Sequence, residues 1–218
     1  MKSDFAAYVF YVNRPDLLCR ALESFPQLWP ELTIVDNSGG GSFFSLPNSE
    51  TFNIFKPPVP LSYTQSMNWM LKNALDKGVD FIIHFHSDAL SVNPNAVDEL
   101  LAYVRDLRDT NRKWGCAWTF YDILWAINPK ALQAIGGWDT VFSAYFCDND
   151  VTRRLTLAGW ECINTNIQGM SHEGSATVKS DPEKLFMNHL TFPMYRHYYV
   201  QKHGGEPGKE LFLTPFNR

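Results

Sequence analysis

Polar side chains that can bind metals or exchange protons follow three apolar runs of the chain. They are Asn13 and Arg14 after residues 5–12, Asp36 and Asn37 after residues 32–35, and His86, Ser87 and Asp88 after residues 81–85. Ligands of open α/β sheets bind outside the carboxyl ends of the strands. If the three runs are strands of one parallel sheet, these polar ends converge on one crevice.

Asp88 is the strongest candidate for a cation ligand. The sequence has neither a GxGxxG nor a GxxxxGK[ST] motif, so a bound nucleotide needs another way to neutralise its phosphates. A divalent cation held by carboxylates is the simplest one. A carboxylate next to a buried strand is costly unless it meets a cation or hydrogen-bond donors. Two interpretations stay open, a metal ligand and a cap of the following turn.

Asp148 and Asp150 lie two residues apart at the predicted start of a helix over 150–157. One of them is expected to cap the helix and the other to face the cleft, where it can serve as a general base. The alternative is a helix start that carries acidic residues for its dipole, and the motif alone is more typical of that.

Histidines offer a second set of metal ligands. His172 lies in a loop-like segment, where a lone histidine is more often structural than a ligand. His84 and His86 alternate along a predicted strand, so both can point to one face. A two-histidine metal site is one interpretation, and simple packing of His84 is the favoured one.

The elements that must position these residues follow an α/β pattern. We expect buried strands at 5–12, 32–35 and 81–85, separated by helices at 15–25 and 64–77 and by an irregular loop at 42–63. The second half is predicted to hold a helix at 94–107, a strand with an aromatic loop at 115–127, and helices at 129–135, 150–157 and 186–200. Strand, helix and strand in alternation favour a parallel sheet.

Composition narrows the class of protein. The chain has 218 residues, of which 45% are hydrophobic, and this excludes a disordered or collagen-like chain. The net charge of −4 disfavours a general nucleic-acid surface. The four cysteines form no CxxC pair, and no signal peptide or transmembrane segment is recognised, so a cytoplasmic protein with reduced thiols is expected.

Seven segments, in order and over about residues 8–177, resemble family-2-type glycosyltransferases with the GT-A fold. In chain order, they look like seven features of that family: the first strand and helix, the "VDN-S" strand end, the asparagine of the next helix, D-x-D, "iGGfDe", "eDxDl" and "HxGS". In the same order, the matching segments are Val12-Asn13-Arg14-Pro15, Ile34-Val35-Asp36-Asn37-Ser38, Ser66-Met67-Asn68-Trp69, His86-Ser87-Asp88, Ala134-Ile135-Gly136-Gly137-Trp138-Asp139, Cys147-Asp148-Asn149-Asp150 and His172-Glu173-Gly174-Ser175.

The resemblance implies a GT-A, Rossmann-like sheet with a small acceptor-side region in residues 1–177, and a helical or irregular extension in 178–218. It implies metal-dependent, inverting transfer of a sugar, of hexosyltransferase type, from a nucleotide sugar (UDP by default). Mn²⁺ or Mg²⁺ would bind Asp88 and His172, Asp148 would be the base, and Trp138 and Asp139 would line the acceptor side. The implied donor-binding residues are Asn13, Arg14, Asp36, Asn37, Asn68, His86 and Ser87.

His86 departs from the family pattern, because it stands where the first aspartate of D-x-D is expected. It can ligate the metal as a neutral imidazole or donate to a phosphate when protonated. Two other functions remain open, a sugar-phosphate nucleotidyltransferase and a non-catalytic carbohydrate-binding protein on the same fold. The acceptor can be a glycan, a lipid-linked sugar, a protein or a modified nucleobase.

Overall fold

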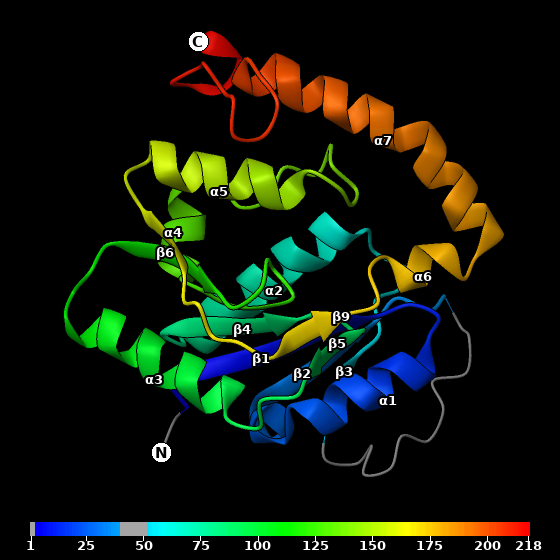
Figure 1. The fold of residues 1–218 in the computed structure, drawn as a ribbon, viewed down its shortest axis with the longest axis vertical. Coiled ribbons are helices and arrows are strands. Elements are labelled where there is room, and N and C mark those ends of the chain that lie inside the picture. Colours follow the sequence, from blue (N-terminus) through cyan, green and yellow to red (C-terminus); the bar gives the residue numbers. More distant parts are fainter. Residues whose placement is uncertain (1–2, 40–51) are drawn as a thin grey trace.

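Four parallel strands build the first half of the central sheet. The structure is a computed structural model that describes residues 3–39 and 52–218 (Figure 1). The strands are β1 (Phe5–Tyr11), β2 (Leu32–Asp36), β3 (Asn53–Phe55) and β4 (Phe81–Phe85), in the spatial order β3-β2-β1-β4. Tyr11 pairs with Asp36, and Val9 pairs with Phe85. The carboxyl ends of β1, β2 and β4 therefore lie at one edge, as predicted. Residues 42–51 of the expected loop lie outside the described residues.

An antiparallel strand joins β4 to the second half of the sheet. The strands are β7 (Leu124–Ile127), β6 (Trp114–Trp118) and β8 (Glu161–Asn164), which extend the order to β4-β7-β6-β8. Because β7 runs antiparallel to both β4 and β6, the turn between β6 and β7 lies at the same edge as the carboxyl end of β4. The backbone N–H of His86 donates to the carbonyl oxygen of Ile123, at 2.9 Å, and fixes this arrangement.

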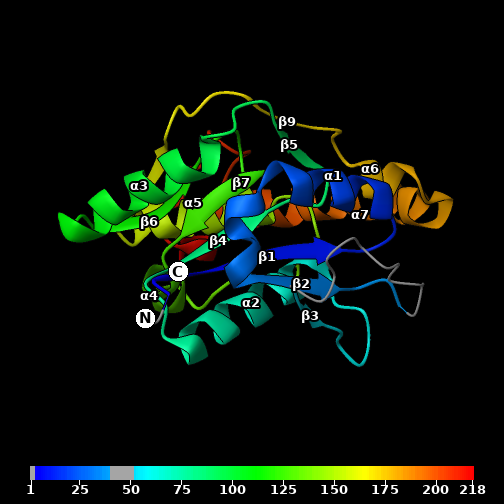
Figure 2. The ribbon, with the colours of Figure 1, turned by 90° about the horizontal axis from the view of Figure 1, so that it is seen from below.

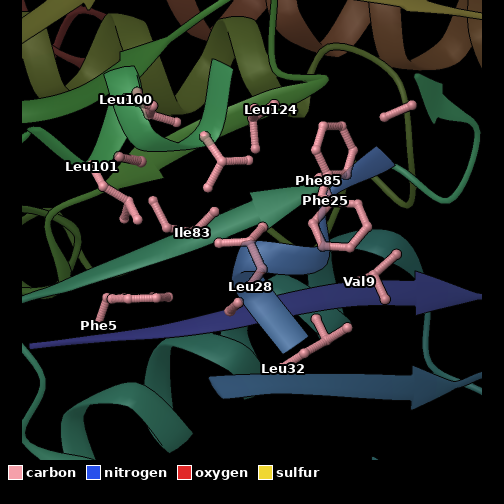
Figure 3. Packing of buried hydrophobic residues seen from close by; sticks show 14 of the residues in the cluster. Phe5, Val9, Phe25, Leu28, Leu32, Ile83, Phe85, Leu100, Leu101 and Leu124 are labelled. Carbon is pink, nitrogen blue, oxygen red and sulfur yellow. The ribbon is translucent and has the colours of Figure 1, made fainter. Parts of the chain in front are cut away.

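Helices cover both faces of the sheet. On one face lie α1 (Pro15–Ser24), the 3₁₀ helix η1 (Pro26–Glu31) and α3 (Ala96–Asp109), and on the other lie α2 (Tyr63–Lys77), α4 (Pro129–Ala134) and α5 (Cys147–Leu157). Figure 2 shows α1 and α3 on the side of the sheet opposite α2. The alternation of side chains along β1 and β4 supplies both cores. Figure 3 shows the first core, in which Val9, Phe25 and Phe85 pack together.

The C-terminal part lies against α5 (Figure 1). It contains α6 (Ala176–Lys179), the long α7 (Pro182–His203) and the 3₁₀ helix η3 (Pro215–Asn217). Tyr199 of α7 is buried in the second core. Asp181 begins α7 earlier than the sequence predicted, because its carboxylate accepts from the backbone N–H groups of Glu183 and Lys184. None of the helices in residues 3–39 and 52–218 has the length and apolar content needed to cross a membrane.

Two further differences from the predicted elements matter for the site. Helix α5 begins three residues before the predicted start, because Phe146 in the left-handed conformation (φ 65°) turns the chain into the helix. Neither Asp148 nor Asp150 is its N-cap, so that expectation is wrong. A small antiparallel sheet of β5 (Ala89–Ser91) and β9 (Met170–His172) was not predicted, and it pairs Ala89 with His172.

Candidate functional site

A cavity of about 390 Å³ opens at the carboxyl edge of the parallel strands. Its walls come from the ends of β1 and β4, the start of α2, the β6–β7 turn, the start of α5, β9 and α6. Half of the twelve predicted site residues line it. They are Asn37, His86, Ser87, Asp88, Asp148 and His172.

Three of these residues form a cluster with the chemistry of a metal site. His86, Asp88 and His172 each offer one ligand atom, and these atoms all lie within 4.8 Å of one another. Pairing of β5 with β9 places His172 beside Asp88, with 3.8 Å between Nδ1 and the nearer carboxylate oxygen. The backbone N–H of Gly174 donates to Nδ1 of His172 at 3.2 Å, so this nitrogen is unprotonated, and a cation bound at Nδ1 would take the place of that hydrogen bond.

The donor set fits a divalent cation that accepts both nitrogen and oxygen ligands. Two imidazoles and one carboxylate suit Mn²⁺ or a later transition metal better than Mg²⁺, which prefers oxygen ligands. Among the described residues that line the cavity there is no lysine or arginine, so no side-chain cation competes for the position. The cluster contains three residues, and His84 is not one of them. The two-histidine site formed by His84 and His86 is therefore not supported.

Asp122 is a site residue that the sequence analysis did not identify. It lies in the β6–β7 turn, and its carboxylate approaches Nε2 of His86 at 3.4 Å. The hydroxyl of Tyr63 lies 3.3 Å from the same nitrogen. Burial alone would lower the pKa of His86, but the negative charge of Asp122 outweighs it and raises that pKa. Asp122 thus orients the His86 ring, in the way that outer-shell carboxylates orient metal-binding histidines.

Asp122 and Asp148 are two carboxylates of one cavity with opposite pKa shifts. Burial raises the pKa of Asp148 to about 6, and the neighbouring charge of Asp122 adds to the effect. Burial would also raise the pKa of Asp122, but the charge and hydrogen bond of His86 outweigh it and lower that pKa to about 2. Two carboxyl groups whose environments separate their pKa values are typical of an acid–base site. Asp148 is the better proton acceptor, because a base with a pKa near the working pH is the most effective.

The predicted residues at the ends of β1 and β2 mainly organise loops around the cavity. The amide of Asn37 donates to Ser66 Oγ at 2.9 Å, and its carbonyl oxygen accepts from the backbone N–H of Leu61. Asn37 therefore fixes the chain that leads into α2. Asp36 is 3% exposed and accepts from the backbone N–H of Ser38 at 2.9 Å. It lies outside the lining of the cavity.

Asn13 and Arg14 also lie outside the cavity lining. The amide of Asn13 donates to the carbonyl oxygen of Thr177 at 3.1 Å, which ties the end of β1 to α6. Arg14 forms an ion pair with Asp16 at 2.6 Å, on the surface. Neither residue contacts the cavity in this structure, and their contacts with a donor stay predictions.

Asn68, Trp138 and Asp139 form a separate group on the far side of α5. Both ends of the Asn68 amide bind the backbone of Trp138, each at 2.8 Å. Asp139 accepts from Tyr198 and Lys202 of α7 at 2.9 and 2.6 Å. Trp138 is 3% exposed, and none of the three lines the cavity. The structure therefore places the predicted acceptor-side residues and Asn68 in contacts that join α2, residues 137–139 and α7.

Comparisons with known proteins agree on the fold. No protein-family model and no curated protein matches the sequence. Among solved structures, the mannosyltransferase PcManGT from Pyrobaculum calidifontis, in complex with GDP-Man and Mn²⁺, is similar with a TM-score of 0.57 and 12% identity. The match covers 75% of this chain and 55% of that one, so this chain spans little more than half of the mannosyltransferase.

Two other solved structures show the same similarity. Glucosyl-3-phosphoglycerate synthase from Mycobacterium tuberculosis, in complex with Mn²⁺, UDP and glucosyl-3-phosphoglycerate, matches 86% of this chain and 78% of its own, with a TM-score of 0.55 and 12% identity. A protein from Bacillus anthracis described as a glucose-1-phosphate thymidylyltransferase is similar over 81% of this chain and 92% of its own, with a TM-score of 0.54 and 10% identity. The chain therefore has the GT-A, Rossmann-like α/β fold that the sequence resemblance implied.

Proposed function

We propose that this chain is a metal-dependent glycosyltransferase that moves a sugar from a nucleotide sugar to an acceptor hydroxyl with inversion. The observation that carries the proposal is the meeting, in one cavity, of the His86, Asp88 and His172 cluster with Asp148. The cluster suits the diphosphate of a donor, and Asp148 has the pKa of a base that works near neutral pH. The similar mannosyltransferase and synthase structures, which contain Mn²⁺ with nucleotides, support the same assignment.

The residues of the chain divide the reaction between them. Asp148 accepts the proton of the acceptor hydroxyl while the oxygen of that hydroxyl forms a bond to the anomeric carbon. The bond from the anomeric carbon to the diphosphate breaks in the same step. Asp122 keeps its negative charge, orients the imidazole of His86 and raises the basicity of Asp148. A cation held by His86, Asp88 and His172 would supply charge neutralisation for the departing nucleoside diphosphate. A base on one side of the sugar and a leaving group on the other invert the centre.

The nucleotide, the cation and the cellular location complete the proposal. We propose UDP as the nucleotide, and Mn²⁺ rather than Mg²⁺ as the cation, because two of the three ligands are imidazoles. We propose the cytoplasm, since all four cysteines are free thiols. Asn13, Asp36 and Asn68 are proposed to act on the donor through the loops and helix that they hold.

A sugar-phosphate nucleotidyltransferase is the alternative enzyme, and the similarity to the Bacillus anthracis structure favours it. Such an enzyme must neutralise a nucleoside triphosphate. The described lining of the cavity contains carboxylates and no lysine or arginine, which disfavours the larger negative charge. A non-catalytic carbohydrate-binding protein does not need a base, and the raised pKa of Asp148 argues for one.

One experiment separates the three functions. The full chain is incubated with Mn²⁺ and either a panel of UDP- and GDP-sugars with simple acceptors or a panel of nucleoside triphosphates with sugar phosphates. The products are resolved by ion-exchange chromatography. Release of a nucleoside diphosphate supports the transferase. Release of pyrophosphate, from a nucleoside triphosphate and a sugar phosphate, would establish the nucleotidyltransferase. Saturable binding of sugars without any turnover would identify a binding protein.

A further inference from the structure

His84 is a buried polar residue of the cavity wall, and its tautomer is fixed by a neighbour. The indole N–H of Trp125 donates to Nδ1 of His84 at 3.1 Å, and both side chains are 1% exposed. Tryptophan is only ever a donor, so Nδ1 of His84 must carry the lone pair. The proton of the neutral imidazole is therefore on Nε2.

This Nε2–H has no hydrogen-bond partner among the described residues. His84 nevertheless lines the cavity, on β4 and two residues before His86. Buried N–H groups almost always have a partner, because an unmade hydrogen bond away from water is costly. A fixed donor without a partner in the wall of a cavity points to an acceptor atom that arrives with a ligand.

The surroundings of His84 indicate which part of a ligand arrives there. Its ring lies 4.7 Å from the Phe10 ring and 5.9 Å from the Tyr63 ring, between centroids. No lysine or arginine among the described residues lines the cavity, so a phosphate has no partner at this depth. Aromatic walls with a few fixed polar groups suit an uncharged, hydroxyl-rich ring.

We propose that Nε2–H of His84 donates a hydrogen bond to one hydroxyl oxygen of the sugar that the donor carries, and so selects that sugar. The inference rests on the proposed function, because it assumes a nucleotide sugar with its diphosphate at the His86, Asp88 and His172 cluster. Trp125 is then a positioning residue, since it holds the proton of His84 on the nitrogen that faces the sugar.

The test compares the affinity of the full chain for UDP and for UDP-glucose, by titration calorimetry with Mn²⁺. The wild type should bind UDP-glucose more tightly than UDP. H84F, which removes the donor and keeps an aromatic ring, should bind UDP unchanged and UDP-glucose about 10-fold more weakly. H84Q is the matched control, because its amide can accept from Trp125 and still donate to the sugar, and it should retain most of the affinity.

A second arm begins with the wild type alone, so it still gives a result if H84F fails to fold. One of the 2-, 3-, 4- and 6-deoxy analogues of UDP-glucose should bind the wild type about 10-fold more weakly than UDP-glucose does. H84F, where it folds, should bind that analogue and UDP-glucose with equal affinity. The inference is overturned if H84F weakens UDP and UDP-glucose equally, or if all four analogues bind like UDP-glucose. Release of pyrophosphate in the product assay would instead defeat the proposed function, and the inference with it.

The fixed tautomer has a readout of its own. In protein labelled with ¹⁵N-histidine, the ring of His84 should show a protonated Nε2 and an unprotonated Nδ1 in a two-bond ¹H–¹⁵N spectrum. W125F should leave the fold in place and allow both tautomers. A wild-type spectrum with the proton on Nδ1 would contradict the hydrogen bond on which the inference stands.

Discussion

Two buried groups of charges flank the first turn of α5, and they differ in how completely they are paired. On one side, Asp148 faces the cavity, and no ion pair of its carboxylate is found among the described residues. On the other, Asp150 accepts from His203, Lys202 and Arg154 at 2.7–2.8 Å. The aspartates are two residues apart, yet the pKa of the first is raised to about 6 and that of the second is lowered to about 2.

The comparison shows how one helix start serves both chemistry and stability. Burial would raise the pKa of Asp150 as well, but its hydrogen bond to His203 and the charges of Arg154 and Lys202 outweigh it. A fully paired carboxylate has no capacity left for a substrate proton. Asp148 is left without such partners, which is costly for folding and useful for a base.

Asp148→Asn should have the largest effect on activity. The amide keeps the shape of the side chain and cannot accept a proton, so turnover should fall by about 10²–10⁴-fold. Donor affinity, measured by calorimetry with Mn²⁺ and a UDP-sugar, should be nearly unchanged. Wild-type turnover in this variant would remove Asp148 as the base.

Asp88→Ala should abolish the effect of the cation on donor binding. Without the only carboxylate of the cluster, two imidazoles remain, and Mn²⁺ should no longer increase the affinity for UDP. The matched control is Asp76→Ala, which removes an exposed carboxylate of α2 outside the cavity. Equal Mn²⁺ dependence in the wild type and in Asp88→Ala would show that the cation binds elsewhere.

Asp150→Asn should lower the stability of the fold and leave the base, Asp148, in place. It leaves Arg154 without its buried counter-charge and Lys202 with Asp139 alone, and breaking such a network costs about 3–5 kcal/mol of unfolding free energy. Chemical denaturation at pH 7 measures this directly, and D76N, on the exposed end of α2, is a suitable control. An unchanged midpoint would mean that the network does not stabilise α5 and α7.

The same network gives stability a defined dependence on pH. The pKa of Asp150 is below its ordinary value in the folded state, so its contribution is complete above about pH 4 and is lost as the pH falls towards 2. The difference in unfolding free energy between the wild type and Asp150→Asn should therefore shrink over this interval.

The sequence predicted the parallel half of the site better than the rest. Residues 81–85 form an apolar strand with His86, Ser87 and Asp88 at its end, and local pattern alone places such residues at a sheet edge. Asp122 could not be found in this way. It reaches the cavity because the β6–β7 hairpin pairs antiparallel with β4, and that pairing joins segments about 40 residues apart.

Motif spacing also located residues without giving their contacts. Asn68 and Asp139 were expected to meet ligands, and each is instead bound to other parts of the chain. Asp139 contacts Lys202, 63 residues further along, and only tertiary packing of α7 creates that partner. Asp122, like Asp88, stands in a turn after an apolar strand, but this local setting does not reveal that the turn meets His86.

The smallest predicted effect is a shift in the pH dependence of turnover, and it tests why the two sides of α5 differ. A base must be unprotonated, so kcat/KM of the wild type should fall as the pH drops through about 6. Asp122→Asn removes a negative charge that helps to raise the pKa of Asp148, so the fall should move to lower pH. It also removes the carboxylate beside His86, which should weaken Mn²⁺ binding about 10-fold or more. Assays at saturating Mn²⁺ separate the two effects, and an acid limb at the same pH in both proteins would show that Asp122 does not tune the base.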